Sequence, residues 1–395
     1  MTDIYLISFS FLLSCTVTIY AIPSLIKLAY QKRLFDDPAL EERKIHKYRT
    51  PNLGGIAVLT SFAFTSCLCI SGNLLPYANY VFASGLLIFL VGLKDDLAAL
   101  NPYKKFVAQA ITAFIVVYFA DIRLSSLYGI FGIHEIHPVI SYPFSTLLIV
   151  FIINAFNLID GINGLLGSVS LIVSLTFGWL FFRTGEFGLA LLAISMAGAV
   201  LGFLRYNAGK ARIFMGDAGA YTIGFIISVL AIQFIELNKF PSYTGIGDSP
   251  FQSVPAVTMA ILIVPILDTL RVIVIRLVQG KSPFIADRNH LHHRLLDTGM
   301  NHTQATLVLS GFNFLMIGTA LTFQHIGTIE LLLLIALTAL LLNTMLWLYD
   351  VRKALSHGQP LVVKENNKEI FPLRDSAREV AEEALQQYEE KQHQN

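Results

Sequence analysis

Eleven long apolar runs constrain this chain more than any other feature of its sequence. A helix that crosses a bilayer needs about 20 apolar residues. The runs cover approximately residues 4–29, 53–71, 76–93, 106–120, 142–159, 164–182, 187–204, 214–235, 253–277, 305–324 and 328–349. Only 14% of the 395 residues are charged, whereas soluble domains carry about a quarter. The sequence therefore predicts an all-α integral membrane protein, a polytopic bundle of about 11 transmembrane helices over residues 1–349, with a charged tail over 350–395.

The basic residues between the runs predict the orientation of the bundle. Cytoplasmic loops of membrane proteins carry an excess of Lys and Arg. If the N-terminus is periplasmic, the cytoplasmic loops hold fifteen Lys and Arg residues, and the opposite loops hold three, Arg123, Arg183 and Lys239. An odd number of spans then places the C-terminus in the cytoplasm. The net charge of +1 gives no overall field that would attract nucleic acid.

Polar side chains gather at four places beside these runs. A carboxylate at the centre of a bilayer costs about 2.5–3.5 kcal/mol on insertion scales, so each cluster needs a reason. The clusters are Lys94–Asp96, Asn154–Gly164, Phe214–Asp217 and Asp287–Arg294. With the orientation above, all four lie at cytoplasmic helix ends or in cytoplasmic loops. We infer that they form one site on that face.

Asp95 and Asp96 are adjacent acids that repel each other unless a cation is near. Mg²⁺ binds few protein carboxylates and keeps positions for waters and substrate phosphates, so the pair suits a site for magnesium and phosphate. The alternative is a solvated helix end, partly neutralised by Lys94, Lys104 and Lys105. Asp217, at the start of the eighth run, offers a similar choice between a metal ligand and a helix N-cap.

Polar residues recur at every third position in the second cluster, as Asn154, Asn157, Asp160 and Asn163. Residues three apart share one face of a helix, so the spacing predicts a polar stripe that reaches the cytoplasmic rim. Hydrogen bonding between helices, which Asn commonly provides within bundles, is the alternative. It would explain Asn154 alone, and it explains Asp160 poorly.

The fourth cluster combines three histidines with two arginines. Its members are Arg288, His290, His292, His293 and Arg294. A zinc site is the obvious rival, but the arginines would repel a dication. We therefore favour binding of a diphosphate by Arg and protonated His donors. A basic loop that contacts lipid head groups is a third interpretation.

Taken in order, these clusters resemble the polyprenyl-phosphate N-acetylhexosamine-1-phosphate transferase family, glycosyltransferase family 4. The resemblance extends from Thr50 to His293 and rests mainly on the runs 154–161 and 214–219. The pattern 282–293 is similar to the GlcNAc-1-phosphate branch. The resemblance implies a bacterial inner-membrane enzyme with its active site on the cytoplasmic face. It would transfer a sugar-1-phosphate, most simply GlcNAc-1-phosphate, from a UDP-sugar to undecaprenyl phosphate and release UMP.

The resemblance also implies roles for individual residues. Asp217, assisted by Asn157, would bind Mg²⁺, for which Mn²⁺ could substitute. Asp95, Asp96 and Asp160 would be catalytic, the first two by orienting the phosphate nucleophile. The substrate-binding residues would be Lys47, Asn163, Phe214, Arg288, His290, His292 and His293, with the uracil held by Asn163 and Phe214. Two departures from the family pattern, Ala99 in place of a polar residue and Asn163 where Asp is frequent, concern only auxiliary roles.

Other functional classes fit the sequence less well. The main rival is a polyisoprenoid transporter or flippase. Transporter sites lie near the bilayer midplane between repeats, whereas these clusters lie at one rim and no repeat is visible, so the sequence favours the transferase. The partners expected are the UDP-sugar, the lipid acceptor and membrane lipid, with a homodimer as one option. Residues 374–392 carry a weak apolar stripe, which predicts either a surface helix or a solvated tail outside catalysis.

Overall fold

The computed structural model describes residues 2–32, 50–239, 251–280, 290–356, 362–365 and 368–372. Its helices are α1 (Thr2–Lys32), α2 (Gly54–Cys69), α3 (Ala78–Leu97), α4 (Pro102–Phe119), η2 (Ile130–Gly132), α5 (Pro138–Leu158), α6 (Leu165–Thr184), α7 (Phe187–Asn207), α8 (Gly216–Leu237), α9 (Val254–Ile261), α10 (Ile263–Val278), α11 (Leu291–Asp297), α12 (His302–Phe323), η3 (Gln324–Ile326) and α13 (Thr328–Ser356). Two short strands, β1 (Val362–Glu365) and β2 (Lys368–Pro372), pair antiparallel after α13. The predicted helical class is confirmed for the part of the chain that contains the apolar runs.

Seven of the predicted spans coincide with helices that are long and apolar enough to cross a bilayer. Within the described ranges these are α1, α5, α6, α7, α8, α12 and α13. The run at 53–71 forms the shorter apolar helix α2, of 16 residues. The runs at 76–93 and 106–120 form α3 and α4. The count of eleven spans and the orientation of the termini remain predictions.

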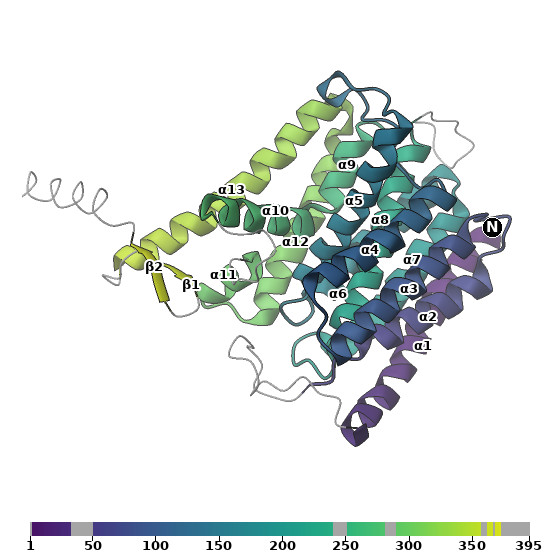
Figure 1. The fold of residues 1–395 in the computed structure, drawn as a ribbon, viewed down its shortest axis with the longest axis horizontal. Coiled ribbons are helices and arrows are strands. Elements are labelled where there is room, and N and C mark those ends of the chain that lie inside the picture. The colour runs from purple at the N-terminus through teal and green to yellow at the C-terminus, as the bar shows by residue number, and fades with distance from the viewer. Residues whose placement is uncertain are drawn as a thin grey trace, which may run out of the picture.

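The ninth run does not form one continuous helix, and Pro265 gives the physical reason. A proline has no N–H to donate to the carbonyl four residues earlier, which here belongs to Ile261. The helix breaks between Ile261 and Ile263, and the freed Ile261 carbonyl instead accepts a hydrogen bond from Asn313 Nδ2 at 3.2 Å. Figure 1 shows that α10 leaves the bundle at an angle to α9 and extends toward α13.

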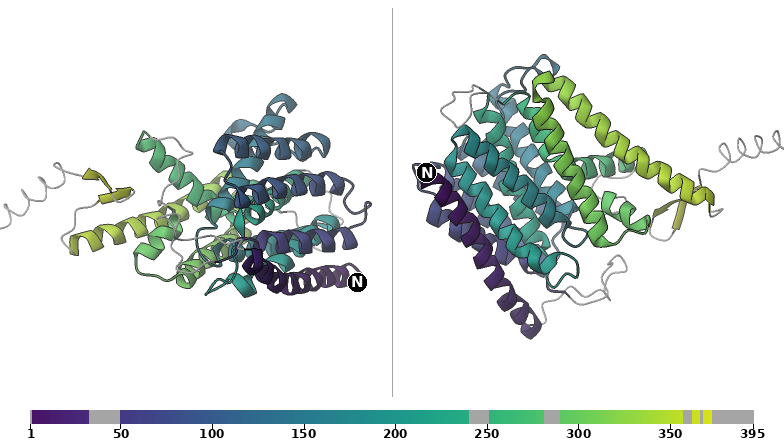
Figure 2. Two further views of the ribbon diagram at one scale, coloured as in Figure 1. Left: turned by 60° about the horizontal axis from the view of Figure 1, so that its bottom comes forward. Right: turned by 180° about the vertical axis from the view of Figure 1, so that it is seen from behind.

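The centre of the bundle is α8. Of the 18 residues in its most apolar stretch, 94% are buried, compared with 17% in α1 and in α13. It packs against α2, α3, α5, α6, α7 and α9. In Figure 2, α1 lies along one side of the bundle, and α13 diverges from the bundle toward its own C-terminal end. A polar group in the first turn of α8 is therefore surrounded by several helix ends.

Glycines bring two neighbouring helices close to this first turn. A Cβ atom on Gly55 of α2 would lie 2.3 Å from the Gly219 nitrogen, and one on Gly92 of α3 would lie 2.5 Å from Ala218 Cα. Side chains at these positions would push the helices apart. The close approach places the C-terminal end of α3 beside the start of α8.

The C-terminal helix is longer than predicted. α13 continues to Ser356, seven residues beyond the expected end at 349. The predicted stripe at 374–392 lies outside the described residues, so the tail helix and the division of the chain at 349 both remain predictions.

Candidate active site

A carboxylate from α3 holds the first turn of α8. Asp96 Oδ1 accepts a hydrogen bond from the Asp217 N–H at 2.8 Å, and Oδ2 accepts one from the Ala218 N–H at 3.0 Å. Asn52 Nδ2 also donates to Oδ1, at 2.8 Å. Gly216 has a φ of 76°, and a Cβ there would lie 2.6 Å from Asp96 Oδ2, so this position requires glycine. The positive end of the α8 dipole thus faces Asp96.

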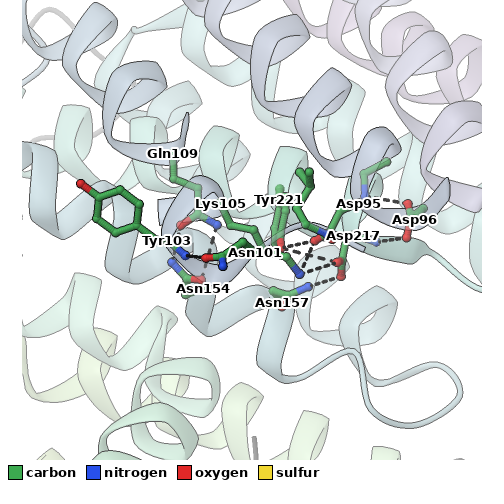
Figure 3. Close-up of polar contacts among 12 residues, drawn as sticks. Asp95, Asp96, Asn101, Tyr103, Lys105, Gln109, Asn154, Asn157, Asp217 and Tyr221 are labelled. Carbon is green, nitrogen blue, oxygen red and sulfur yellow. Dashed lines mark hydrogen bonds and ion pairs between the residues drawn. The ribbon is translucent and has the colours of Figure 1, made fainter. Parts of the chain in front are cut away.

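Asp95 is 8% exposed and makes a different set of contacts, drawn in Figure 3. It accepts hydrogen bonds from the Leu100 N–H at 2.8 Å and from the Tyr221 hydroxyl at 3.1 Å. It also forms an ion pair with Lys105. Lys105 Nζ and the Tyr221 hydroxyl oxygen lie 3.8 Å and 3.5 Å from Asp217 Oδ2. Lys105 therefore neutralises the charge of Asp95, whereas backbone N–H groups compensate the charge of Asp96.

The predicted polar stripe divides between two roles. Asn157 Nδ2 donates to Asp217 Oδ1 at 2.8 Å, so this residue belongs to the acidic cluster. Asn154 instead donates to Gln109 Oε1 of α4 at 2.7 Å, and Gln109 is 1% exposed. Hydrogen bonding between helices, the alternative that the sequence offered for Asn154, is thus confirmed for this residue.

Asp160 and Asn163 lie in the loop between α5 and α6, because α5 ends at Leu158. The prediction that they continue a stripe on one helix face is therefore wrong. Burial, followed by the charges of Asp217 and Asp96, raises the pKa of the Asp160 carboxyl well above its usual value, although the Gly216 N–H opposes this shift. This dependence on Asp217 and Asp96 places Asp160 beside the acidic cluster. Asn163 Nδ2 donates to the Gly209 carbonyl at 2.8 Å, and its Oδ1 is buried without a hydrogen-bond partner among the described residues.

The segment before α8 is clamped to the segment before α2. The Phe214 N–H donates to the Pro51 carbonyl at 2.8 Å, and the Gly54 N–H donates to the Phe214 carbonyl at 2.8 Å. Phe214 is half-buried. These backbone bonds join the Phe214 segment to the segment at which the resemblance begins, and they hold the Phe214 main chain three residues before Asp217.

The three histidines form a cluster at the start of α11. The rings of His290 and His292 stack with centroids 5.4 Å apart, and His292 and His293 lie 4.3 Å apart. His292 is 2% exposed and packs against Gly161, where a Cβ atom would lie 2.1 Å from its Nε2. Burial, followed by the charge of His293, lowers the pKa of His292 to about 3. This shift favours the neutral imidazole at His292, whereas the sequence analysis favoured protonated donors in the cluster. The substrate-binding role of His292 remains a prediction.

Sequence reasoning missed several residues that the structure adds, and two predicted residues lie outside the described ranges. The additions are Asn52, Tyr221 and Asp268, together with Lys105 as a bridge between two carboxylates. Tyr221 follows Asp217 by one helical turn, and Asp268 is an acid inside an apolar run. The sequence pattern could therefore have identified both residues as candidates. Lys47 and Arg288 are not described, and their assigned roles remain predictions.

The donor set fits a magnesium ion bound by few protein ligands. Asp217 is accompanied by Asn157 and by the carboxylates of Asp95, Asp96 and Asp160, and the excess negative charge favours a cation. In the described ranges, no three His, Cys, Asp or Glu side chains are grouped so that they could hold one ion. An ion at Asp217 would therefore leave most of its coordination positions to water and phosphate, as Mg²⁺ does.

Comparisons with known proteins identify the family of this chain. Residues 78–235, from α3 into α8, match the family model of glycosyl transferase family 4. An undecaprenyl-phosphate alpha-N-acetylglucosaminyl 1-phosphate transferase of Escherichia coli is 30% identical over 327 residues, covering 80% of this chain and 84% of the relative. The protein of the same name from Salmonella typhi is 30% identical over 308 residues, covering 76% and 79%. A decaprenyl-phosphate N-acetylglucosaminephosphotransferase of Mycolicibacterium smegmatis is 35% identical over 296 residues, covering 68% and 70%.

Proposed function

The chain belongs to glycosyl transferase family 4, and we propose that its donor is UDP-N-acetylglucosamine and that it works with Mg²⁺ on the cytoplasmic face of a bacterial inner membrane. It is a multi-pass membrane protein that transfers a sugar-1-phosphate to a polyprenyl phosphate. The names of its relatives specify N-acetylglucosamine, and the pattern at 282–293 favours the same branch. The UDP-linked N-acetylglucosamine, the metal, the bacterial inner membrane and its cytoplasmic face are the proposed elements.

One observation carries the proposal. The carboxylates of Asp95, Asp96 and Asp217 meet at the start of α8, and Lys105 contacts two of them. The ends of three helices supply this cluster, and Asp160 lies beside it. Such a concentration of acid at one end of an apolar bundle is expensive without a cation and a substrate to compensate it. Phosphoryl transfer between two anionic substrates requires both positive charge and accurate positioning.

The reaction follows from the chemistry of the two substrates. A phosphate oxygen of the polyprenyl phosphate attacks the phosphorus bonded to the sugar, the bond from this phosphorus to the bridging oxygen breaks, and UMP leaves with the electron pair. The second pKa of a phosphate monoester is about 6, so the nucleophile is largely dianionic near pH 7 and needs no strong base. Bound Mg²⁺ would compensate charge on the diphosphate. Lys105 would add positive charge next to Asp217, and the Asn157 amide would hold the Asp217 carboxylate in place.

An apolar groove offers a place for the polyprenyl chain. It has a volume of about 1060 Å³ and lies between α10 and α13, lined by residues such as Ile263, Leu267, Val274, Leu333 and Leu340. Arg271 and Arg294 also line it, and Arg271 Nε donates to Asn343 Oδ1 at 2.8 Å. We propose that isoprene units of the acceptor lipid occupy the apolar length of this groove.

Orientation has its own test. Reporter fusions after His357 and near Ser242 should report opposite sides of the membrane, with the His357 fusion in the cytoplasm, because fifteen of the eighteen counted loop cations then lie inside. Two fusions on the same side would contradict the proposed orientation.

The function is tested with the purified full chain in detergent. It is incubated with undecaprenyl phosphate, Mg²⁺ and, in parallel, UDP-N-acetylglucosamine, UDP-N-acetylgalactosamine, UDP-glucose or UDP-MurNAc-pentapeptide, and UMP release is recorded. We expect UDP-N-acetylglucosamine to give the highest kcat/KM and no UMP without the lipid acceptor. Activity with UDP-MurNAc-pentapeptide but not with UDP-N-acetylglucosamine would overturn the donor assignment.

A further inference from the structure

A buried carboxylate on α10 contacts the histidine cluster but takes no part in the reaction described above. Asp268 is 1% exposed and lies in the middle of an apolar helix. Its Oδ2 is 2.8 Å from His290 Nδ1, and its Oδ1 accepts a hydrogen bond from the Leu291 N–H at 2.6 Å. One carboxylate thus holds both a histidine ring and the backbone at the start of α11, from 22 residues away in the sequence.

From His290 the contacts continue to the acidic site. The His290 ring stacks on His292 with an angle of 11° between the ring planes. His292 packs against Gly161, the residue after Asp160. Both ring nitrogens of His292 are buried without a hydrogen-bond partner among the described residues. Within the described residues, packing alone holds the His292 ring, so its position depends on the rings beside it and on the Asp268–His290 pair.

The chemistry of the pair also decides which nitrogen of His290 can bind a ligand. A carboxylate bonded to one ring nitrogen fixes the ring orientation and its tautomer. Since Nδ1 is bound to Asp268, Nε2 is the nitrogen left for a ligand. A buried carboxylate requires a partner to compensate its charge, so Asp268 and His290 stabilise each other's placement.

We propose that Asp268 is a positioning residue for the transfer reaction, which acts through His290 to place the histidine cluster beside the Asp160 loop. The proposal rests on the proposed function, in which the histidines bind the diphosphate of the donor. Asp268 itself does not contact a substrate. Its removal should therefore weaken use of the sugar nucleotide and leave use of the polyprenyl phosphate unchanged.

A double-mutant cycle tests this coupling in the purified full chain. Asp268→Asn, His290→Gln and the double variant are compared for UMP release at varied donor and acceptor concentrations. We expect each single variant to lower kcat/KM for the donor by about 10–100-fold, by analogy with the loss of a carboxylate that orients a metal-ligating histidine. The KM for the acceptor should stay within about twofold, and the double variant should be no worse than His290→Gln.

Thr269→Val is the matched control, because this neighbour is 4% exposed and its hydroxyl has no hydrogen-bond partner within the described part of the chain. It should keep wild-type kinetics. If Asp268→Asn does not accumulate in membranes, Asp268→Glu, which keeps the charge and the acceptor oxygens, replaces it and should raise the donor KM less than His290→Gln does.

The outcomes separate the two proposals. Independent, multiplying losses in the double variant, or a raised acceptor KM in either Asp268 variant, would overturn the positioning role. Wild-type kinetics of His290→Gln would remove the donor-binding role of His290 and the positioning role with it, while transfer itself remained. Absence of UMP release from the wild-type chain with every donor would instead contradict the proposed function.

Discussion

Replacement of Asp96 by Asn should destabilise the first turn of α8 as well as reduce activity. Asp96 accepts three hydrogen bonds, two from the N–H groups of Asp217 and Ala218 and one from Asn52. Asn presents only one oxygen, so at least one of the two α8 N–H groups would face an amide NH₂. An unpaired buried donor costs about 1–3 kcal/mol, and loss of a negative charge at a helix N-terminus costs about 0.3–1 kcal/mol. The expected loss of stability is therefore about 1.3–4 kcal/mol.

The assay is thermal unfolding of the purified protein in detergent, followed by tryptophan fluorescence, together with UMP release. Asp121→Asn is the matched control, because it removes the same charge from an ion pair with Arg123 in which the Asp121 side chain is 67% exposed, and such pairs contribute about 0–1 kcal/mol. The Asp96 variant should unfold several degrees below both the wild type and this control. An Asp96→Asn protein that loses turnover with unchanged unfolding would refute the capping argument and assign Asp96 to the chemistry alone.

Three further predictions concern the same site and its surroundings. Asp217→Asn should abolish UMP release at every Mg²⁺ concentration while the protein still accumulates in membranes, and near-normal activity at low Mg²⁺ would exclude Asp217 as the metal ligand. Gly161→Ala should lower UMP release at least tenfold, because its Cβ would lie 2.1 Å from Nε2 of His292, whereas Gly318→Ala, with nothing within 4 Å, should have wild-type activity. Truncation after Gly358 should leave UMP release within a few-fold of the full chain, and a loss comparable to that of Asp217→Asn at normal abundance would show that the tail shapes the active site.

The sequence by itself determined the helices and the residues of the acidic site. A segment in lipid must satisfy its backbone hydrogen bonds internally, so a long apolar run predicts a helix whatever its neighbours are. Polar residues beside such runs are costly, which is why Asp95, Asp96, Asn157 and Asp217 could be selected before any contact was known. The structure brings these four together at the start of α8.

The tertiary structure decided which partner each polar group has. Nothing in the adjacent pair Asp95 and Asp96 indicates that one binds Lys105 and the other caps α8. Pro265 accounts for the break after Ile261, but the partner of the freed Ile261 carbonyl, Asn313, comes from α12. Asp268 meets His290 only because α10 turns toward α11. Apolar length and residue type specify that a helix forms, but its rotation and depth follow from packing between helices, and that packing depends on side chains far apart in the chain.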